Sequence, residues 1–282
     1  MEKQFIFYAR PSKIGAIMTE ARGATITEKQ LAELEGLLSK VKLTEKQAEK
    51  RDQLIAKRDA KPELSKTAKT VVEEQLLKDV FGINREFWSK ETDKGNECEQ
   101  DSIDLLKKVG GLFGIEKNET TFKNDFLRGT PDVLGDEPVI DVKTPWSGST
   151  FPWFAQELPD KAYEWQLRGY MALTGRKVGY VAYCLTNATE DIIQDEIRRT
   201  CWREKIIEPT DEQVDEIENR VRWQMEFDHV PDALRVKLFK VEHDEKAEQA
   251  IRDRVELCRE YYNKRLAELF ANMDAAPIIP NV

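Results

Sequence analysis

The sequence predicts one α/β domain, residues 1–282, with a helical insertion at about 25–60 and a long C-terminal helix. Two observations carry this prediction: segments with strand character are grouped mid-chain, and segments with helical periodicity surround them. The composition agrees, because 40% of the residues are hydrophobic and 34% are charged, as in a globular protein with a charge-rich surface. A chain of 282 residues is also long enough to bury a sizeable core.

The first elements are expected to be helical. Residues 5–18 begin with a short apolar stretch, and a helix starts at Arg10-Pro11-Ser12. Thr27-Glu28-Lys29-Gln30 and Thr44-Glu45-Lys46-Gln47 each fit a capping box, with threonine as the cap and glutamine three residues on. We therefore predict a helical hairpin at 25–60 and interpret it as a structural insertion.

Helices and strands alternate along the rest of the chain. Ser65 begins a helix that ends near Gly82, because glycine readily adopts the left-handed conformation that ends helices. Further helices are expected at about 95–109, 160–173 and 244–272. Segments with strand character, where β-branched and aromatic residues are frequent, lie at 114–122, 130–134, 139–144, 178–185 and 235–242. The first three of these segments predict a three-strand meander.

Cysteine and histidine patterns restrict the kind of metal site. Cys98, Cys184, Cys201 and Cys258 form no CxxC pair, so neither a zinc site nor an iron–sulfur cluster is indicated. The chain has only two histidines. A catalytic metal would therefore rest on carboxylates, which favours hard cations such as Mg²⁺ or Mn²⁺.

Charge and hydropathy restrict location and partners. The sequence has no run of about eighteen apolar residues that would cross a membrane, and its N-terminus lacks the apolar core of a signal peptide. We therefore expect a cytoplasmic protein without a membrane segment. The net charge of −9, taken alone, argues against a nucleic-acid partner.

Two acids and a lysine lie on adjacent predicted strands. Asp132 directly follows a proline, and Asp141 and Lys143 are two residues apart. Because side chains alternate along a strand, Asp141 and Lys143 point to one face, whereas their neighbours Ile140 and Val142 point to the other. Two antiparallel strands then bring Asp132 and Asp141 within reach of one cation, with Lys143 beside it.

This arrangement suits hydrolysis of a phosphodiester bond. Carboxylates hold a divalent cation, which lowers the pKa of a bound water and neutralises charge on the phosphate. A neighbouring lysine can orient the attacking water or help to deprotonate it, and it can also stabilise negative charge in the transition state. The backbone carbonyl of Val142 is a further candidate metal ligand. The Asp-x-Lys triplet alone is weak evidence in so charged a chain, but an acid and a lysine within an apolar strand demand a reason.

Two further groups of polar residues flank these strands. Gly95 and Glu99 form a Gly-x-x-x-Glu pattern at the start of a predicted helix, and Glu99 is a candidate metal ligand. Gln166 and Tyr170 lie four apart and therefore share a face of a later helix. Glu99 and Gln166 also have purely structural interpretations. An acid near a helix start is favoured by the helix dipole, and glutamine is a good helix former.

In this order and spacing, Gly-x-x-x-Glu, Pro-Asp, Asp-x-Lys-x-Pro and Gln-x-x-x-Tyr resemble the YqaJ-type viral recombinase family. That family includes the phage lambda exonuclease and is a branch of the RecB-like PD-(D/E)XK nucleases. The resemblance runs from about Arg10 to the C-terminal helix and is weakest over 25–60. It implies a restriction-endonuclease-like core with a central mixed β-sheet flanked by helices.

The resemblance also implies site residues. The catalytic set would be Glu99, Asp132, Asp141 and Lys143, with Gln166 in support. The acids would bind two divalent ions, Mg²⁺ or Mn²⁺, and the lysine would act on the attacking water.

The expected DNA contacts come from outside this set. By resemblance, Arg10 and Ser12 are the nearest match to a stretch that holds a DNA 5′-phosphate. We add Tyr170 and Trp153 as candidate DNA-binding residues. Trp153 belongs to an aromatic loop with Trp146, Phe151 and Phe154, which either stacks on bases or caps the core.

The function implied is a metal-dependent exonuclease on linear double-stranded DNA, working from a 5′ end in phage-type recombination. A ring-shaped trimer and a single-strand annealing protein as partner are also implied, in the bacterial host cytoplasm if a phage encodes the chain. The acidic net charge does not exclude this, because a nuclease needs only a positive groove. The alternatives are a structure- or sequence-specific endonuclease on the same core, and a non-catalytic DNA-binding protein.

Overall fold

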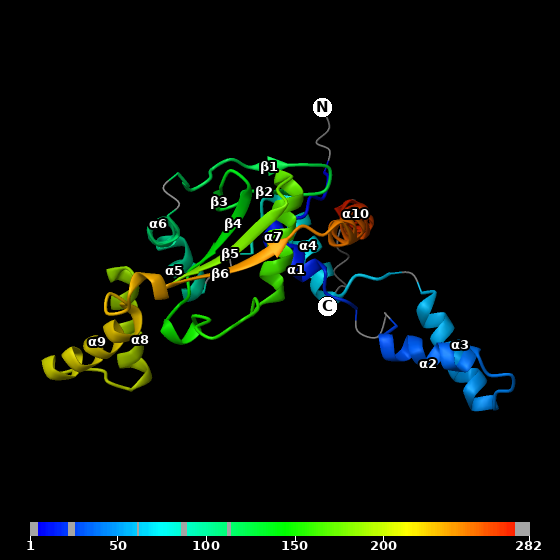
Figure 1. Ribbon diagram of the computed structural model, residues 1–282, viewed down its shortest axis with the longest axis horizontal. Helices are drawn as coiled ribbons and strands as arrows, with labels where there is room; N and C mark the ends of the chain where they lie inside the picture. Colours follow the sequence, from blue (N-terminus) through cyan, green and yellow to red (C-terminus); the bar gives the residue numbers. More distant parts are fainter. Residues whose placement is uncertain (1–4, 22–25, 61, 86–88, 112–113, 274–282) are drawn as a thin grey trace, which may run out of the picture. The chain divides into compact units, whose positions relative to one another are not determined.

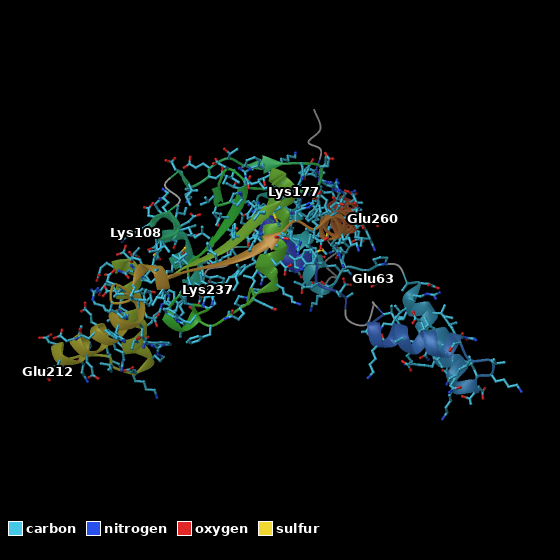
Figure 2. All side chains as sticks on the ribbon, in the orientation of Figure 1. Glu63, Lys108, Lys177, Glu212, Lys237 and Glu260 are labelled. Atoms are coloured by element: carbon cyan, nitrogen blue, oxygen red, sulfur yellow. The ribbon has the colours of Figure 1, made fainter. Side chains whose placement is uncertain are left out.

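The computed structural model describes residues 5–21, 26–60, 62–85, 89–111 and 114–273. The chain falls into two compact units. Figure 1 labels their helices and strands, and Figure 2 shows their side chains, many of them charged. Unit 1 comprises Met1–Ala9, Lys13–Asn84 and Gln249–Val282, and unit 2 comprises Arg10–Ser12 and Arg85–Glu248. The expectation of a single domain over 1–282 stays a prediction. No helix of the described residues combines the length and apolar character needed to cross a membrane.

Unit 1 is helical. It contains most of α1 (Pro11–Ile17), α2 (Glu28–Leu38), α3 (Glu45–Arg58), α4 (Lys66–Phe81) and most of α10 (Glu245–Met273). Thr27 and Thr44 each form the predicted capping box. The helices α2 and α3 bury Leu34, Leu37 and Leu54 between them, so the predicted hairpin is confirmed.

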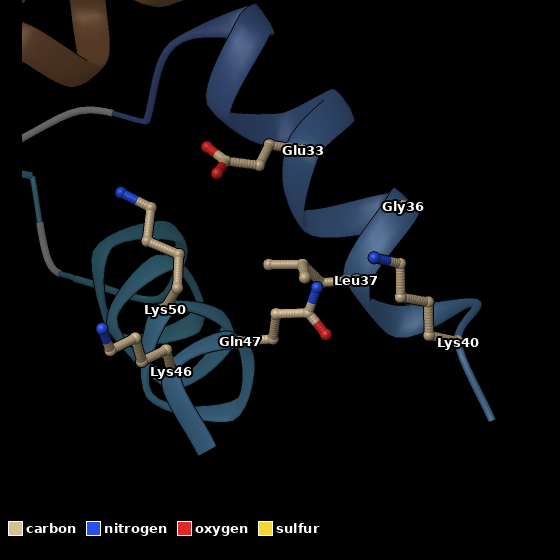
Figure 3. A pocket seen from close by; sticks show the side chains of 7 residues that line it. All are labelled: Glu33, Gly36, Leu37, Lys40, Lys46, Gln47 and Lys50. Atoms are coloured by element: carbon tan, nitrogen blue, oxygen red, sulfur yellow. The ribbon is translucent and has the colours of Figure 1, made fainter. Parts of the chain in front are cut away.

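A groove runs between the two helices of this hairpin (Figure 3). It is lined mainly by polar and charged side chains: Glu33, Gly36, Leu37, Lys40, Lys46, Gln47 and Lys50.

The ends of α4 are those that the sequence predicts. The side chain of Ser65 accepts a hydrogen bond from the Ala68 amide at 3.0 Å, and Gly82 ends the helix with a left-handed φ of 72°. The Tyr262 hydroxyl of α10 donates to Asp79 of α4 at 3.0 Å, and its ring packs on Phe7.

Unit 2 is built on a mixed four-stranded sheet. Its strands are β3 (Val133–Leu134), β4 (Pro138–Lys143), β5 (Val178–Cys184) and β6 (Val236–Glu242), in the order β3-β4-β5-β6. β4 and β5 run parallel, and the outer pairs are antiparallel. The crossover between the parallel strands contains α7 (Lys161–Thr174). A separate two-stranded pair joins β1 (Phe122–Lys123) and β2 (Arg128–Gly129).

Helices cover both faces of the sheet. On one face, Ile140 and Val142 of β4 pack with Ile103 and Leu106 of α6 (Glu99–Gly110). On the other face, Val139 of β4 packs in a cluster with residues of α7, β5 and β6: Leu167, Tyr170, Met171, Val181, Tyr183, Phe239 and Val241. The alternation predicted for β4 is therefore present.

The remaining helices of unit 2 are α5 (Lys90–Glu97), α8 (Glu190–Arg203) and α9 (Asp211–Met225). The helices α8 and α9 share a core with Ala188, to which they contribute Ile192, Ile193, Ile197, Ile217, Val221 and Met225.

Parts of the predicted secondary structure were wrong. Residues 114–122 do not form the first strand of a meander: only the last of them, Phe122, belongs to a strand, where it pairs with Gly129, and Lys117 makes an isolated bridge to Val133. The Asn118 side chain instead donates to the carbonyls of Thr120 and Pro131, a local arrangement that competes with strand pairing.

The helix predicted at 95–109 is also divided. Cys98, with φ −99° and ψ 11°, separates α5 from α6. The sequence of α5, KETDKGNE, lacks an apolar stripe and includes a glycine, so little favours one continuous helix here.

Candidate active site

The end of β4 brings two carboxyl groups together. Asp141 lies within β4 and is fully buried. Asp132 lies at a bend just before β3, whereas we expected it within a strand. Its Oδ2 accepts a hydrogen bond from the Val142 amide of β4 at 2.8 Å. The two acids are therefore neighbours, as the sequence predicts.

A lysine and a glutamine complete this cluster. Lys143 Nζ lies 2.8 Å from Asp141 Oδ2. Gln166 of α7 donates from Nε2 to Asp141 Oδ1 at 2.7 Å and accepts from Lys143 Nζ at 3.3 Å. The helix α7, in the crossover after β4, thus places the Gln166 amide in contact with both Asp141 and Lys143.

The electrostatics of the cluster follow from its burial. Desolvation raises the pKa of Asp141, against the opposing effect of Lys143. Desolvation raises the pKa of Asp132 as well, and the charge of Asp141 adds to it. Burial works against the charge of Lys143, but the two carboxylates outweigh it and raise the pKa of the ammonium. Lys143 is therefore charged, and a further cation at the site would stabilise the ionised form of the two carboxyl groups.

The donor set fits a hard divalent cation. Asp141 Oδ2 is buried, and the ion pair with Lys143 is its contact among the described residues. Two neighbouring buried carboxyl groups are suitable ligands for Mg²⁺ or Mn²⁺. Among the described residues, however, no three His, Cys, Asp or Glu side chains converge as a ready metal cluster.

Glu99, the expected third acid, is the first residue of α6 and forms an ion pair with Lys117. Its charge acts on Asp132, whose pKa it contributes to raising after the larger effects of burial and Asp141. The assignment of Glu99 and of the Val142 carbonyl as metal ligands stays a prediction.

Three residues of this region were missed by sequence reasoning. Lys117 is the partner of Glu99, and no signal in the sequence indicates this pair. The centre of the Tyr163 ring lies 4.5 Å from Lys143 Nζ. Tyr163 is three residues before Gln166 on α7, and this spacing would have indicated that the two share a helix face. Lys94, which directly precedes Gly95, is fully buried, and the polar sequence around it does not indicate this.

The candidate DNA-binding residues fall in different settings. Arg10 and Ser12 are exposed. Pro11 between them lies close to Gly129 of β2, where an added Cβ would be 2.6 Å from the proline ring. The proposed phosphate-binding stretch thus runs beside the segment that leads to Asp132. Tyr170 is buried, and burial, followed by the charges of Asp132 and Asp141, raises the pKa of its hydroxyl.

The aromatic loop both caps the core and reaches solvent. Phe151 is buried, and Trp146 packs against the core of α8 and α9. Trp153 is 37% exposed, and its indole donates to the Gly148 carbonyl at 2.6 Å. Phe154 is 91% exposed, so it is the aromatic residue of this loop most accessible to a base. The role of Trp153 in DNA binding stays a prediction.

Comparison with known proteins yields matches among solved structures. No protein-family model matches the sequence, and no curated protein matches it. A phage-related exonuclease from Haemophilus somnus 129PT is 24% identical, with a TM-score of 0.64 over 94% of this chain and 97% of that one. An alkaline exonuclease (LHK-Exo) from Laribacter hongkongensis is 13% identical, with a TM-score of 0.55 over 95% and 93%.

The chain has the fold of these exonucleases. A structure of LHK-Exo in complex with dAMP also matches, with 14% identity and a TM-score of 0.50 over 90% of this chain and 95% of that one. The α/β nuclease fold that the sequence resemblance implies is therefore confirmed.

Proposed function

We propose that the protein is a metal-dependent exonuclease that hydrolyses linear double-stranded DNA. The cluster of Asp132, Asp141, Lys143 and Gln166 carries this proposal, since it combines two buried acids, a charged lysine and a glutamine amide that contacts both Asp141 and Lys143. The two similar structures are named as exonucleases, which favours action at DNA ends over internal cleavage.

The roles follow from the geometry. Asp132 and Asp141 would hold Mg²⁺ or Mn²⁺, two ions when Glu99 also serves, and the metal would supply Lewis acidity and an activated water. Gln166 fixes one oxygen of Asp141 and leaves the other directed to Lys143. Lys143 keeps its proton beside the two acids. It therefore acts as a cation that orients the attacking water and offsets charge on the phosphate.

Further parts of the proposal concern the substrate and its handling. Arg10 and Ser12 bind the 5′-phosphate, so that digestion runs 5′ to 3′. The product is single-stranded DNA for recombination, handed to an annealing protein in the bacterial cytoplasm, and the chain acts as a trimer. Tyr170 and Trp153 take part in binding the DNA.

Digestion of matched DNA substrates tests the activity. Linear duplex with 5′-phosphates and covalently closed circular duplex are incubated with Mg²⁺ or with chelator, beside Lys143→Ala. We expect loss of the linear DNA only, and only with Mg²⁺ and Lys143. Lys107→Ala is the matched control, because Lys107 is a surface lysine of α6 paired with Asp104, and it should digest DNA like the wild type.

Each other outcome is informative. Cleavage of the closed circle would replace the exonuclease by an endonuclease. Digestion by Lys143→Ala at the wild-type rate would refute the catalytic assignment.

A further inference from the structure

A lysine is completely buried in unit 2 outside the acid cluster. Lys94 of α5 has no exposed surface. Its Nζ donates to the backbone carbonyls of Pro145 and Trp146, each at 3.0 Å, and lies 5.3 Å from the centre of the Phe227 ring. No ion pair with a described carboxylate accompanies these contacts.

Such burial is costly. An ammonium group removed from water is disfavoured unless charged or dipolar partners compensate. Burial lowers the pKa of Lys94 to about 8. Alanine or leucine would fill a core position without this cost but could not donate the two hydrogen bonds to Pro145 and Trp146.

The two hydrogen bonds of Lys94 are made just beyond the end of β4, where pairing with β5 stops. The parallel register of β4 with β5 ends at Lys143, opposite Tyr183. Lys94 binds the carbonyls two and three residues further on. Between these points, the Thr144 hydroxyl is hydrogen-bonded to that of Ser102 in α6 at 2.8 Å.

A second lysine of α5 acts on the same segment. Lys90 lies one helical turn before Lys94, and its Nζ is 4.5 Å from the centre of the Trp146 ring. It is partly exposed, and among the described residues it donates no hydrogen bond to the backbone of this segment, so it restrains the segment less than Lys94 does.

We propose that Lys94 is a positioning residue for the proposed nuclease reaction: it fixes the segment after β4 and thereby holds Lys143 beside Asp141. The inference rests on the proposed function. Lys94 touches neither substrate nor the reacting atoms; it acts through the backbone of Pro145 and Trp146. Displacement of a catalytic group by about 1 Å is enough to reduce a rate about 100-fold.

Three variants test the proposal. Lys94→Met keeps the length and apolar stem but removes the donors and the charge. Lys94→Arg restores both. Lys90→Met is the matched control, since it changes a lysine of the same helix face without touching the backbone bonds.

The first readout is steady-state digestion of linear duplex. We expect Lys94→Met to lower kcat about 100-fold with KM within about twofold of the wild type, Lys94→Arg to recover part of kcat, and Lys90→Met to stay within about threefold. A Lys94→Met protein that is folded by circular dichroism and has the wild-type kcat would overturn the proposal.

The second readout does not need activity. Hydrogen–deuterium exchange of peptides covering 139–150 should be faster in Lys94→Met than in the wild type, and much less affected in Lys90→Met, which removes only a contact with the Trp146 ring. Unchanged exchange in Lys94→Met would overturn the positioning role even if the nuclease is active. If exchange is faster in Lys94→Met but the wild-type protein itself cuts no DNA, the proposed function is refuted. The role of Lys94 in fixing the segment after β4 is then still supported.

Discussion

Replacing Lys143 by methionine tests the electrostatics of the site without a nuclease assay. The change removes the cation 2.8 Å from Asp141 Oδ2 and leaves a fully buried carboxyl group without its partner. Removal of one member of a buried ion pair typically costs about 3–5 kcal/mol. For a chain of this size, with roughly 2–4 °C per kcal/mol, the melting temperature should fall by about 10 °C.

The loss should depend on pH in a defined direction. Burial already raises the folded-state pKa of Asp132 and Asp141 above their unfolded values. Stability from such groups is present below the unfolded pKa and is lost as pH rises through the folded pKa. Without Lys143 these pKa values rise further, so Lys143→Met should approach the wild type at pH 5 and fall well below it at pH 8.

Thermal unfolding followed by circular dichroism, in chelator at both pH values, measures the effect. The double variant Lys143→Met/Asp141→Asn removes both charges and should recover most of the stability, whereas Lys107→Met should stay within about 0.5 kcal/mol of the wild type. Equal losses at pH 5 and pH 8, or no recovery in the double variant, would refute this account of the site.

Three other predictions concern packing, the buried lysine and the metal. Gly179→Ala in β5 should destabilise the protein by about 1–3 kcal/mol, because the added Cβ would lie 2.8 Å from Leu167 Cγ. Gly95→Ala has open space around it and should be neutral or stabilise by up to about 1 kcal/mol. If urea unfolding ranks the two variants the other way, the packing described for β5 and α7 is contradicted. Since burial lowers the pKa of Lys94 to about 8, the unfolded state binds more protons above that pH, so wild-type stability should rise relative to Lys94→Met between pH 8 and 10, by at most about 3 kcal/mol; parallel curves in chemical denaturation would count against this. Mg²⁺ at pH 8 should raise the melting temperature of the wild type but not of Asp141→Asn, and an equal rise in both would place the ion elsewhere.

The parts of the site that share one element were predictable from the sequence. Period-two alternation indicated that Asp141 and Lys143 share a face and that Ile140 faces the core. Helical periodicity in the same way indicated the common face of Gln166 and Tyr170. These inferences need only the local geometry of one strand or one helix.

The parts that depend on long-range packing were not predictable. The pairing of Glu99 with Lys117 depends on the path of residues 114–122, which we expected to be a strand. The burial of Lys94 follows from its position against Pro145, Trp146 and Phe227, far away in sequence. A polar stretch such as that of α5 gives no indication that one of its charges is in the core.

Because α7 lies in the crossover from β4 to β5, the four residues of the cluster are close together in the sequence. Asp132, Asp141, Lys143 and Gln166 all lie within residues 132–166, and their mutual contacts close short loops. Short loops cost little chain entropy, so this segment has low contact order and is suited to form early in folding. Insertions before Asp132 or after β5, such as the α2–α3 hairpin or the α8–α9 pair, lengthen only connections outside it. Changes in the length of those outer connections therefore leave the loops that close between these four residues unchanged.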